Sequence, residues 1–193
     1  MAKNFNNHYT VSKEICGNKI VAQFSGLSTA TRMGRMTKID GTDNTSFEKL
    51  AEYLFEYVIV EPKLSIKDFG KDKIGEIQTK VIDGVEYRAK FDGLLTALRS
   101  VDESYDDEGE GTDIDKLAEY LFEHIIVKPK DLTVDSFETL DTFKKVVRFA
   151  QETMQGGEVW KEYKEIIAFA QNVMNGRFRD QKDKGATGEA SKG

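Results

Sequence analysis

The sequence predicts an α+β protein, mostly helical: two tandem β-hairpin-plus-helix units (9–75 and 76–142), two C-terminal helices (143–176) and a disordered tail (177–193). Three observations predict it: a long internal repeat, a shorter repeat near the C-terminus, and a change from two-residue to 3.6-residue apolar periodicity within each unit. With 193 residues, 39% hydrophobic and 32% charged, the chain can form small cores with much solvated surface.

The long repeat is a duplication of about 67 residues. Residues 49–63 read KLAEYLFEYVIVEPK and residues 116–130 read KLAEYLFEHIIVKPK, with twelve of the fifteen positions identical. Upstream, eight of the sixteen residues of 17–32 recur in 84–99 at the same offset of 67, without a gap. We therefore expect the two units to share one fold.

Each unit opens with a predicted β-hairpin. In the first unit the expected strands are Thr10–Ile15 and Lys19–Phe24, around a turn at Gly17-Asn18. The second unit repeats them at Glu76–Ile82 and Val85–Phe91 around an Asp-Gly pair, which is a strong hairpin signal. A Gly-Leu pair then begins a short predicted helix in each unit, and because a lone hairpin is marginal in water, each hairpin must pack on other elements.

A longer amphipathic helix follows in each unit. Apolar residues recur at i, i+3, i+4 and i+7 along 47–59, and the same stripe returns along 114–126. Thr45 and Glu48 fit a capping box at the start of the first of these helices. Each helix is expected to stop before one of the chain's two prolines, Pro62 and Pro129, because the residue before proline disfavours the α conformation.

The shorter repeat places residues 144–156 on residues 164–176 at an offset of 20. Each copy is typical of a helix with one apolar face, and Gly156-Gly157 separates the two, as glycine often does past a helix end. Two units and two terminal helices suggest one helix for each unit: the first helix packs on the second unit, which it follows directly, and the second helix covers the first unit. Residues 177–193 are polar and without periodicity, which predicts disorder.

Composition excludes several classes of protein. Lys and Arg number 28 and Asp and Glu 34, so the formal net charge is −6, which argues against general nucleic-acid binding. The single cysteine, Cys16, leaves no intramolecular disulfide and no cysteine-built zinc site. The sequence shows neither a signal peptide nor an apolar segment long enough for a membrane span, so we expect a cytosolic protein.

Few residues could carry catalysis, since the sequence contains no phosphate loop, dinucleotide fingerprint or nucleophile elbow. His124 stands where the first unit has Tyr57, and neither it nor His8 has a visible partner. The acidic run 102–115 contains the start of an EF-hand pattern, but Leu117 occupies the position that requires a bidentate glutamate. A solvated linker is the preferred interpretation of that run, and we expect no enzyme activity, no cofactor and no metal.

The apolar faces of the two terminal helices have two interpretations. The preferred one is core filling. The other is recognition of a partner by helix-in-groove contact, for which the candidate residues are Phe149, Met154, Trp160, Tyr163, Phe169 and Met174.

The sequence resembles the tail assembly chaperones of tailed phages that infect Gram-positive bacteria. The resemblance covers most of residues 10–180. It begins with a strand-rich segment, followed by the helix that here reads LAEYLFEYVIVEPK. It continues with a polar step to an aromatic residue, Leu64–Phe69 and again Leu132–Phe137. It ends with a helix of the form VVxFAxxxxxG, here Val146–Gly156 and Ile166–Gly176.

This resemblance implies a non-enzymatic protein of the host cytoplasm. Such proteins keep the tape measure protein soluble during tail morphogenesis, help to recruit tail tube subunits, and are not in the mature virion. Two other classes stay open: a small acidic adaptor or inhibitor of a host nucleic-acid-acting protein, and an enzyme that uses carboxylates. A homo-oligomer, through exchange of a terminal helix between chains, also stays open.

Overall fold

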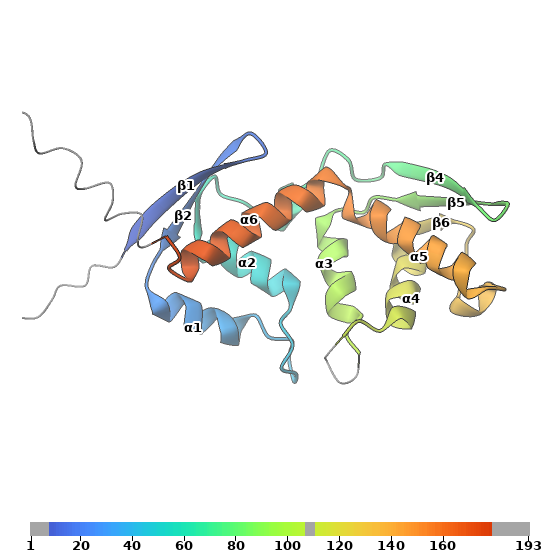
Figure 1. Cartoon of the computed structure of the whole chain (residues 1–193), viewed down its shortest axis with the longest axis horizontal. Helices are drawn as coiled ribbons and strands as arrows, with labels where there is room; N and C mark the ends of the chain where they lie inside the picture. The colour runs from blue at the N-terminus through green and yellow to red at the C-terminus, as the bar shows by residue number, and fades with distance from the viewer. Residues whose placement is uncertain (1–7, 107–110, 179–193) are drawn as a thin grey trace, which may run out of the picture.

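A computed structural model describes residues 8–106 and 111–178 (Figure 1). Within these residues the fold is α+β, as predicted, with two three-stranded antiparallel sheets of order β1-β2-β3 and β4-β5-β6. The first unit comprises β1 (Tyr9–Ile15), β2 (Asn18–Phe24), α1 (Leu27–Met36), α2 (Phe47–Tyr57), β3 (Ile59–Glu61) and the 3-10 turn η1 (Ile66–Asp68).

The second unit repeats this order of elements. It comprises β4 (Ile77–Ile82), β5 (Val85–Lys90), α3 (Leu94–Glu103), α4 (Ile114–His124), β6 (Ile126–Lys128) and η2 (Val134–Ser136). The register repeats too, since Ala22 pairs with Ile59 in the first sheet and Ala89 pairs with Ile126 in the second. The prediction that the two units share one fold is confirmed at the level of topology and register.

Two predicted turn and cap positions were wrong by one residue. The first hairpin turns at Cys16-Gly17, and both residues have positive φ (49° and 81°). The Asp83-Gly84 pair at the turn of the second hairpin has the same conformation, with φ of 49° and 85°. The N-cap of α2 is Ser46 rather than Thr45, since the Ser46 hydroxyl accepts a hydrogen bond from the backbone N–H of Lys49 at 3.1 Å.

Both long helices end before the prolines, as predicted, but they are shorter than the apolar stripes along 47–59 and 114–126 suggest. Helix α2 ends at Tyr57 and α4 at His124, well before the prolines, and a three-residue strand follows each helix. The residues after Tyr57 are Val, Ile and Val, whose β-branched side chains fit a pleated sheet better than a helix. Strands β3 and β6 therefore extend each hairpin to a three-stranded sheet.

Each sheet is covered by one terminal helix (Figure 1). Helix α5 (Leu140–Gln155) contacts β4, β5, α3 and α4, whereas α6 (Glu158–Met174) contacts β1, β2, α1 and α2. The Tyr163 ring of α6 meets Phe69 edge-on with centroids 6.0 Å apart, and Phe143 of α5 meets Phe137 at 5.6 Å. This is the arrangement expected from one terminal helix for each unit.

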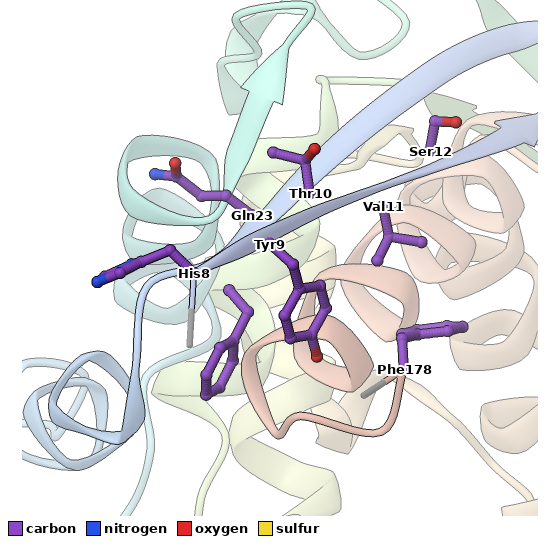
Figure 2. A pocket seen from close by; sticks show the side chains of 8 residues that line it. His8, Tyr9, Thr10, Val11, Ser12, Gln23 and Phe178 are labelled. Atoms are coloured by element: carbon purple, nitrogen blue, oxygen red, sulfur yellow. The ribbon is translucent and has the colours of Figure 1, made fainter. Parts of the chain in front are cut away.

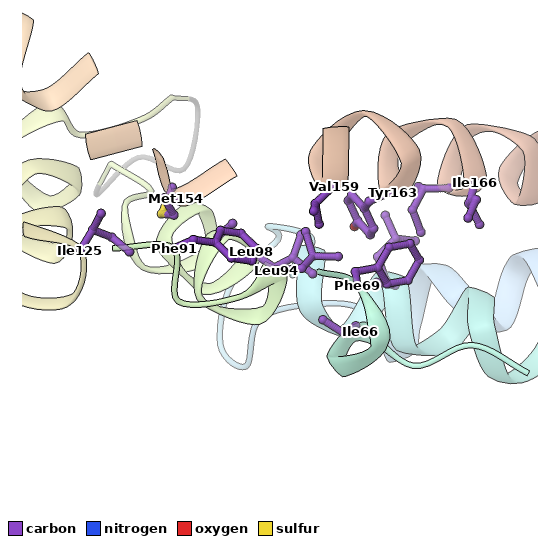
Figure 3. Close-up of a cluster of buried hydrophobic side chains, with 14 of the residues drawn as sticks. Ile66, Phe69, Phe91, Leu94, Leu98, Ile125, Met154, Val159, Tyr163 and Ile166 are labelled. Carbon is purple, nitrogen blue, oxygen red and sulfur yellow. The ribbon is translucent and has the colours of Figure 1, made fainter. Parts of the chain in front are cut away.

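The buried apolar side chains form one cluster that runs through both units and both terminal helices (Figure 3). Phe91 lies between the first unit and the end of α5. Its ring packs closely on both Gly70 and Gly156, since a Cβ on either glycine would come within 3.0 Å of the ring. The two units therefore share a core rather than forming separate domains. The predicted disordered tail falls outside the described residues, except for Arg177 and Phe178, and the Phe178 ring lies 6.0 Å from that of Phe169.

Candidate functional site

The partner-binding residues suggested by the sequence lie mostly in the core. The side chains of five of them, Phe149, Met154, Tyr163, Phe169 and Met174, are less than 5% exposed. The sixth, Trp160, is half-buried and packs on Tyr163 with ring centroids 5.4 Å apart. The described chain therefore uses these faces to cover its own sheets and leaves little of them for a partner.

One apolar surface is left exposed on the second sheet. Ile77 and Val81 of β4 are 59% and 66% exposed, and with Thr79 between them they face away from α5. We call these three residues the β4 surface. Large exposed apolar side chains gathered on one strand are typical of contact sites for other proteins.

The alternation of β4 fixes which side chains face outward. On the inner side, Gln78 accepts a hydrogen bond from the Thr153 hydroxyl of α5 at 3.3 Å. Lys80 places its ammonium 5.7 Å from the centroid of the Phe149 ring, and Ile82 is buried. Because these contacts hold the inner side chains on α5, Ile77, Thr79 and Val81 must point to the opposite face.

The first unit does not carry this surface. At the offset of 67, the residues that match Ile77, Thr79 and Val81 are Thr10, Ser12 and Glu14, which are polar and exposed. The two sheets therefore have the same topology but differ in their outer faces. Comparing the repeats for their differences would have located these substitutions in the sequence, but only the packing of α5 shows that the three side chains face outward.

Strand β4 is also an edge strand (Figure 1). Within the described residues it pairs with β5 alone, so the backbone groups on its other side have no ladder partner there. It contains no proline or glycine, the residues that commonly interrupt such edges. An extended segment of another chain could add to this edge by main-chain hydrogen bonds.

A charged strip borders the β4 surface on the next strand. Glu86 of β5 forms ion pairs with Arg88 at 3.0 Å and with Lys128 of β6 at 3.1 Å. The hydrogen bond from Lys128, with the charge of Arg88, lowers the pKa of the Glu86 carboxyl below its usual value. The outer face of this sheet thus combines an apolar edge with a polar rim, an arrangement common in protein interfaces.

A hollow of about 610 Å³ opens along the start of β1 (Figure 2). Tyr9, which stacks on Phe24 with centroids 5.2 Å apart, and Phe178 form its apolar part. His8 and Ser12 also line it, but four residues of extended strand separate them by about 13 Å. This imidazole and this hydroxyl therefore do not form a nucleophile–base pair.

The other residues weighed for chemistry have structural contacts. His124 packs on Tyr120 with ring centroids 4.3 Å apart, as Tyr57 packs on Tyr53 at 4.7 Å in the first unit. Of the acidic run, residues 107–110 lie outside the described residues. Asp113 caps α4 by accepting from the backbone N–H of Asp115 and of Lys116. In the described part of the chain, no group of three or more His, Cys, Asp or Glu side chains could hold a metal ion.

Comparison with known proteins adds no relative. The chain has no significant match among protein-family models, curated proteins or solved structures. Among the helices of residues 8–106 and 111–178, none has the length and apolar character needed to cross a membrane.

Proposed function

We propose that this chain is a non-enzymatic assembly chaperone that holds another protein through the β4 surface. The observation that carries the proposal is that the second unit alone combines an unpaired edge strand with exposed apolar side chains. The sequence resemblance supplies the setting: tail assembly in a phage-infected cell, with the tape measure protein as the client and tail tube subunits as further partners. The protein acts in the host cytoplasm and is not in the mature virion.

The mechanism follows from the physical chemistry of strand addition. An extended client segment pairs with β4 through main-chain hydrogen bonds, and its alternate apolar side chains pack on Ile77 and Val81. Burying an aliphatic side chain fully contributes about 1.5–3 kcal/mol, and both side chains are already partly covered. Each contact is therefore weak, which suits a chaperone that must release its client during assembly.

Co-expression with the tape measure protein tests this proposal. The variant Ile77→Thr/Val81→Thr keeps the β-branched shape of both residues and puts a hydroxyl in place of the ethyl group of Ile77 and of one methyl group of Val81. We expect it to lower the soluble, co-purifying fraction of the client at least several-fold with an unchanged melting temperature. The matched control is Ser12→Glu on β1, at the position equivalent to Thr79, which should leave co-purification unchanged.

Two results would refute the proposal. One is equal client recovery with the wild type and with the double variant. The other is loss of client with the Ser12→Glu control as well, because the effect would then not be specific to β4. The alternative role as an acidic adaptor predicts instead that the chain inhibits a nuclease or competes with DNA, and Ile77→Thr/Val81→Thr should leave that activity intact.

A further inference from the structure

The two units meet through unlike faces. Helix α3 of the second unit lies against α2 and η1 of the first. The Asp102 carboxylate accepts hydrogen bonds from the Ser46 hydroxyl at 2.6 Å and from the backbone N–H of Phe47 at 2.7 Å. The Arg99 guanidinium donates to both carboxylate oxygens of Glu48, at 2.9 and 3.1 Å. We call this contact the inter-unit junction.

The junction also has an apolar part. Leu94 and Leu98 of α3 are 1% and 0% exposed, and Ile66 of η1 and Phe69 are 5% and 6% exposed. All four belong to the shared buried cluster (Figure 3). Charged pairs at the N-terminus of α2 and an apolar contact at η1 therefore make up one continuous interface.

Because the chain is a duplication, the positions of each half of this junction occur twice, although on α1 Thr31 stands in place of Leu98. The helices α1, α2, α3 and α4 lie in a row, with α1 at one end and α4 at the other (Figure 1). At the α1 end, Leu27 takes the place of Leu94 and is 62% exposed. At the α4 end, Ile114 takes the place of Phe47 and is 50% exposed, and Val134 takes the place of Ile66.

The charges at the two ends are opposite. The α1 end carries Arg32 and Arg35, both exposed, whereas α4 carries Asp115, Glu119 and Glu123, also exposed. We call these surfaces the basic end and the acidic end. Attraction between them would orient two copies in the same sense along the row of helices.

Superimposing the junction on the two ends gives specific pairs. By the offset of 67, Arg32 corresponds to Arg99 and Asp115 to Glu48, so the ion pair of the junction recurs as Arg32–Asp115. Arg35 corresponds to Asp102 and Asp113 to Ser46, so both partners of the second contact have changed in a way that restores attraction. If only one partner had changed, Asp113 would face another aspartate, or Arg35 would face an uncharged serine.

We propose that copies of this chain associate head to tail, with the basic end of one docked on the acidic end of the next. In the single chain Arg32 lies 5.4 Å from the centroid of its own Tyr57 ring, so its side chain rotates when it pairs with Asp115. The contact joins two different surfaces, so it leaves a free basic end and a free acidic end after each addition. It therefore builds a ring or a linear array rather than a closed symmetric dimer. This inference does not depend on the proposed function.

Sedimentation velocity over a range of protein and salt concentrations tests the association. We expect mass to rise with protein concentration and to fall with added salt, because the contact is charged. The basic-end variant Arg32→Glu/Arg35→Glu and the acidic-end variant Asp115→Lys/Glu119→Lys should each weaken association at least about tenfold. The control Arg148→Glu/Lys164→Glu changes two exposed cations on α5 and α6, outside both ends, and should associate like the wild type.

A mixing experiment separates this contact from a symmetric one. This experiment uses the neutral variants Arg32→Gln/Arg35→Gln and Asp115→Asn/Glu119→Gln, because the altered ends of the two charge-reversal variants would attract each other. The first neutral variant keeps a working acidic end and the second keeps a working basic end, so an equimolar mixture should form heterodimers and stop there. Unchanged circular dichroism and melting temperature establish that both variants are folded. The proposal is overturned if the wild type stays monomeric at several hundred micromolar, if the control weakens association equally, or if the mixture stays monomeric while the wild type associates.

Discussion

Two neighbouring glycines between α5 and α6 differ in their surroundings. Gly156 and Gly157 both have positive φ, at 63° and 55°. A Cβ on Gly156 would lie 2.6 Å from Cε2 of Phe91, whereas a Cβ on Gly157 would meet no atom within 4 Å. The substitution Gly156→Ala should therefore lower the free energy of unfolding by about 1–3 kcal/mol more than Gly157→Ala does, as measured by urea denaturation. Equal losses would contradict this packing of Phe91.

Removing the hydroxyl should affect stability differently at two buried tyrosines, because only one of the two hydroxyls has a hydrogen-bond partner in the described part of the chain. The Tyr163 hydroxyl is buried and has no hydrogen-bond partner among the described residues, and burial raises its pKa above the usual value. The Tyr53 hydroxyl donates to the backbone carbonyl of Thr29 at 2.8 Å. We expect Tyr53→Phe to cost about 0.5–1.5 kcal/mol of unfolding free energy, and Tyr163→Phe to cost nothing or to stabilise the protein. A larger loss at Tyr163 than at Tyr53 in thermal denaturation would refute this.

Asp83 links the turn of the second hairpin to α5 through hydrogen bonds. Its carboxylate accepts from the Thr142 hydroxyl at 2.7 Å and from the Lys145 ammonium at 3.0 Å, and these bonds, that of Thr142 first, lower its pKa below 3.8. Because the folded-state pKa is lowered, the stabilisation is fully present above about pH 3.8 and is lost as the pH falls through the folded-state value. An NMR titration should give a pKa below 3.8, and Thr142→Val should raise it. A pKa of Asp83 at or above 3.8 in the wild type would contradict these hydrogen bonds to Thr142 and Lys145.

At the scale of elements, we expect the central leucines of α2 and α4 to contribute similarly to the stability of the fold. Leu54 and Leu121 occupy equivalent positions and are each 0% exposed. Leu54→Ala and Leu121→Ala should each cost about 2–5 kcal/mol, through lost transfer free energy and the cavity left behind. The exposed Glu52→Ala on α2 is the control and should change stability by less than about 0.5 kcal/mol. Denaturant titrations check all three, and a small loss at either leucine would contradict its central place in the core.

Periodicity predicted most of the elements because it reports which side chains are buried. The Asp83-Gly84 pair located the second hairpin, and the stripe of α4 located the helix. The strands β3 and β6 were missed because their apolar residues continue the helical stripe, so only pairing with β2 and β5 reveals them. The β4 surface was missed because it depends on which face of the strand α5 covers, and this is a tertiary property.

At the scale of the whole molecule, duplication has produced one body with two unlike sheets. The terminal helices cover the units in the opposite order to the chain: α5, which comes first, covers the second unit, and α6 covers the first unit. Each sheet and its two helices would leave an apolar face open without that cover, since a small sheet needs a packing partner. The single core in turn fixes the β4 surface at one edge and the basic and acidic ends at opposite sides.

Truncation after Gly156, followed by amide hydrogen exchange, tests most directly the claim that each unit is closed by its own terminal helix. Helix α6 contributes Tyr163, Ile166 and Phe169 to the core over the first unit. The truncated chain should bind a hydrophobic dye and lose amide protection in β1, β2 and α2, while β4, β5 and α4 keep theirs. A control that ends at residue 178 should match the full chain. A truncated chain that stays monomeric, binds no dye and keeps full protection in the first unit would contradict the claim.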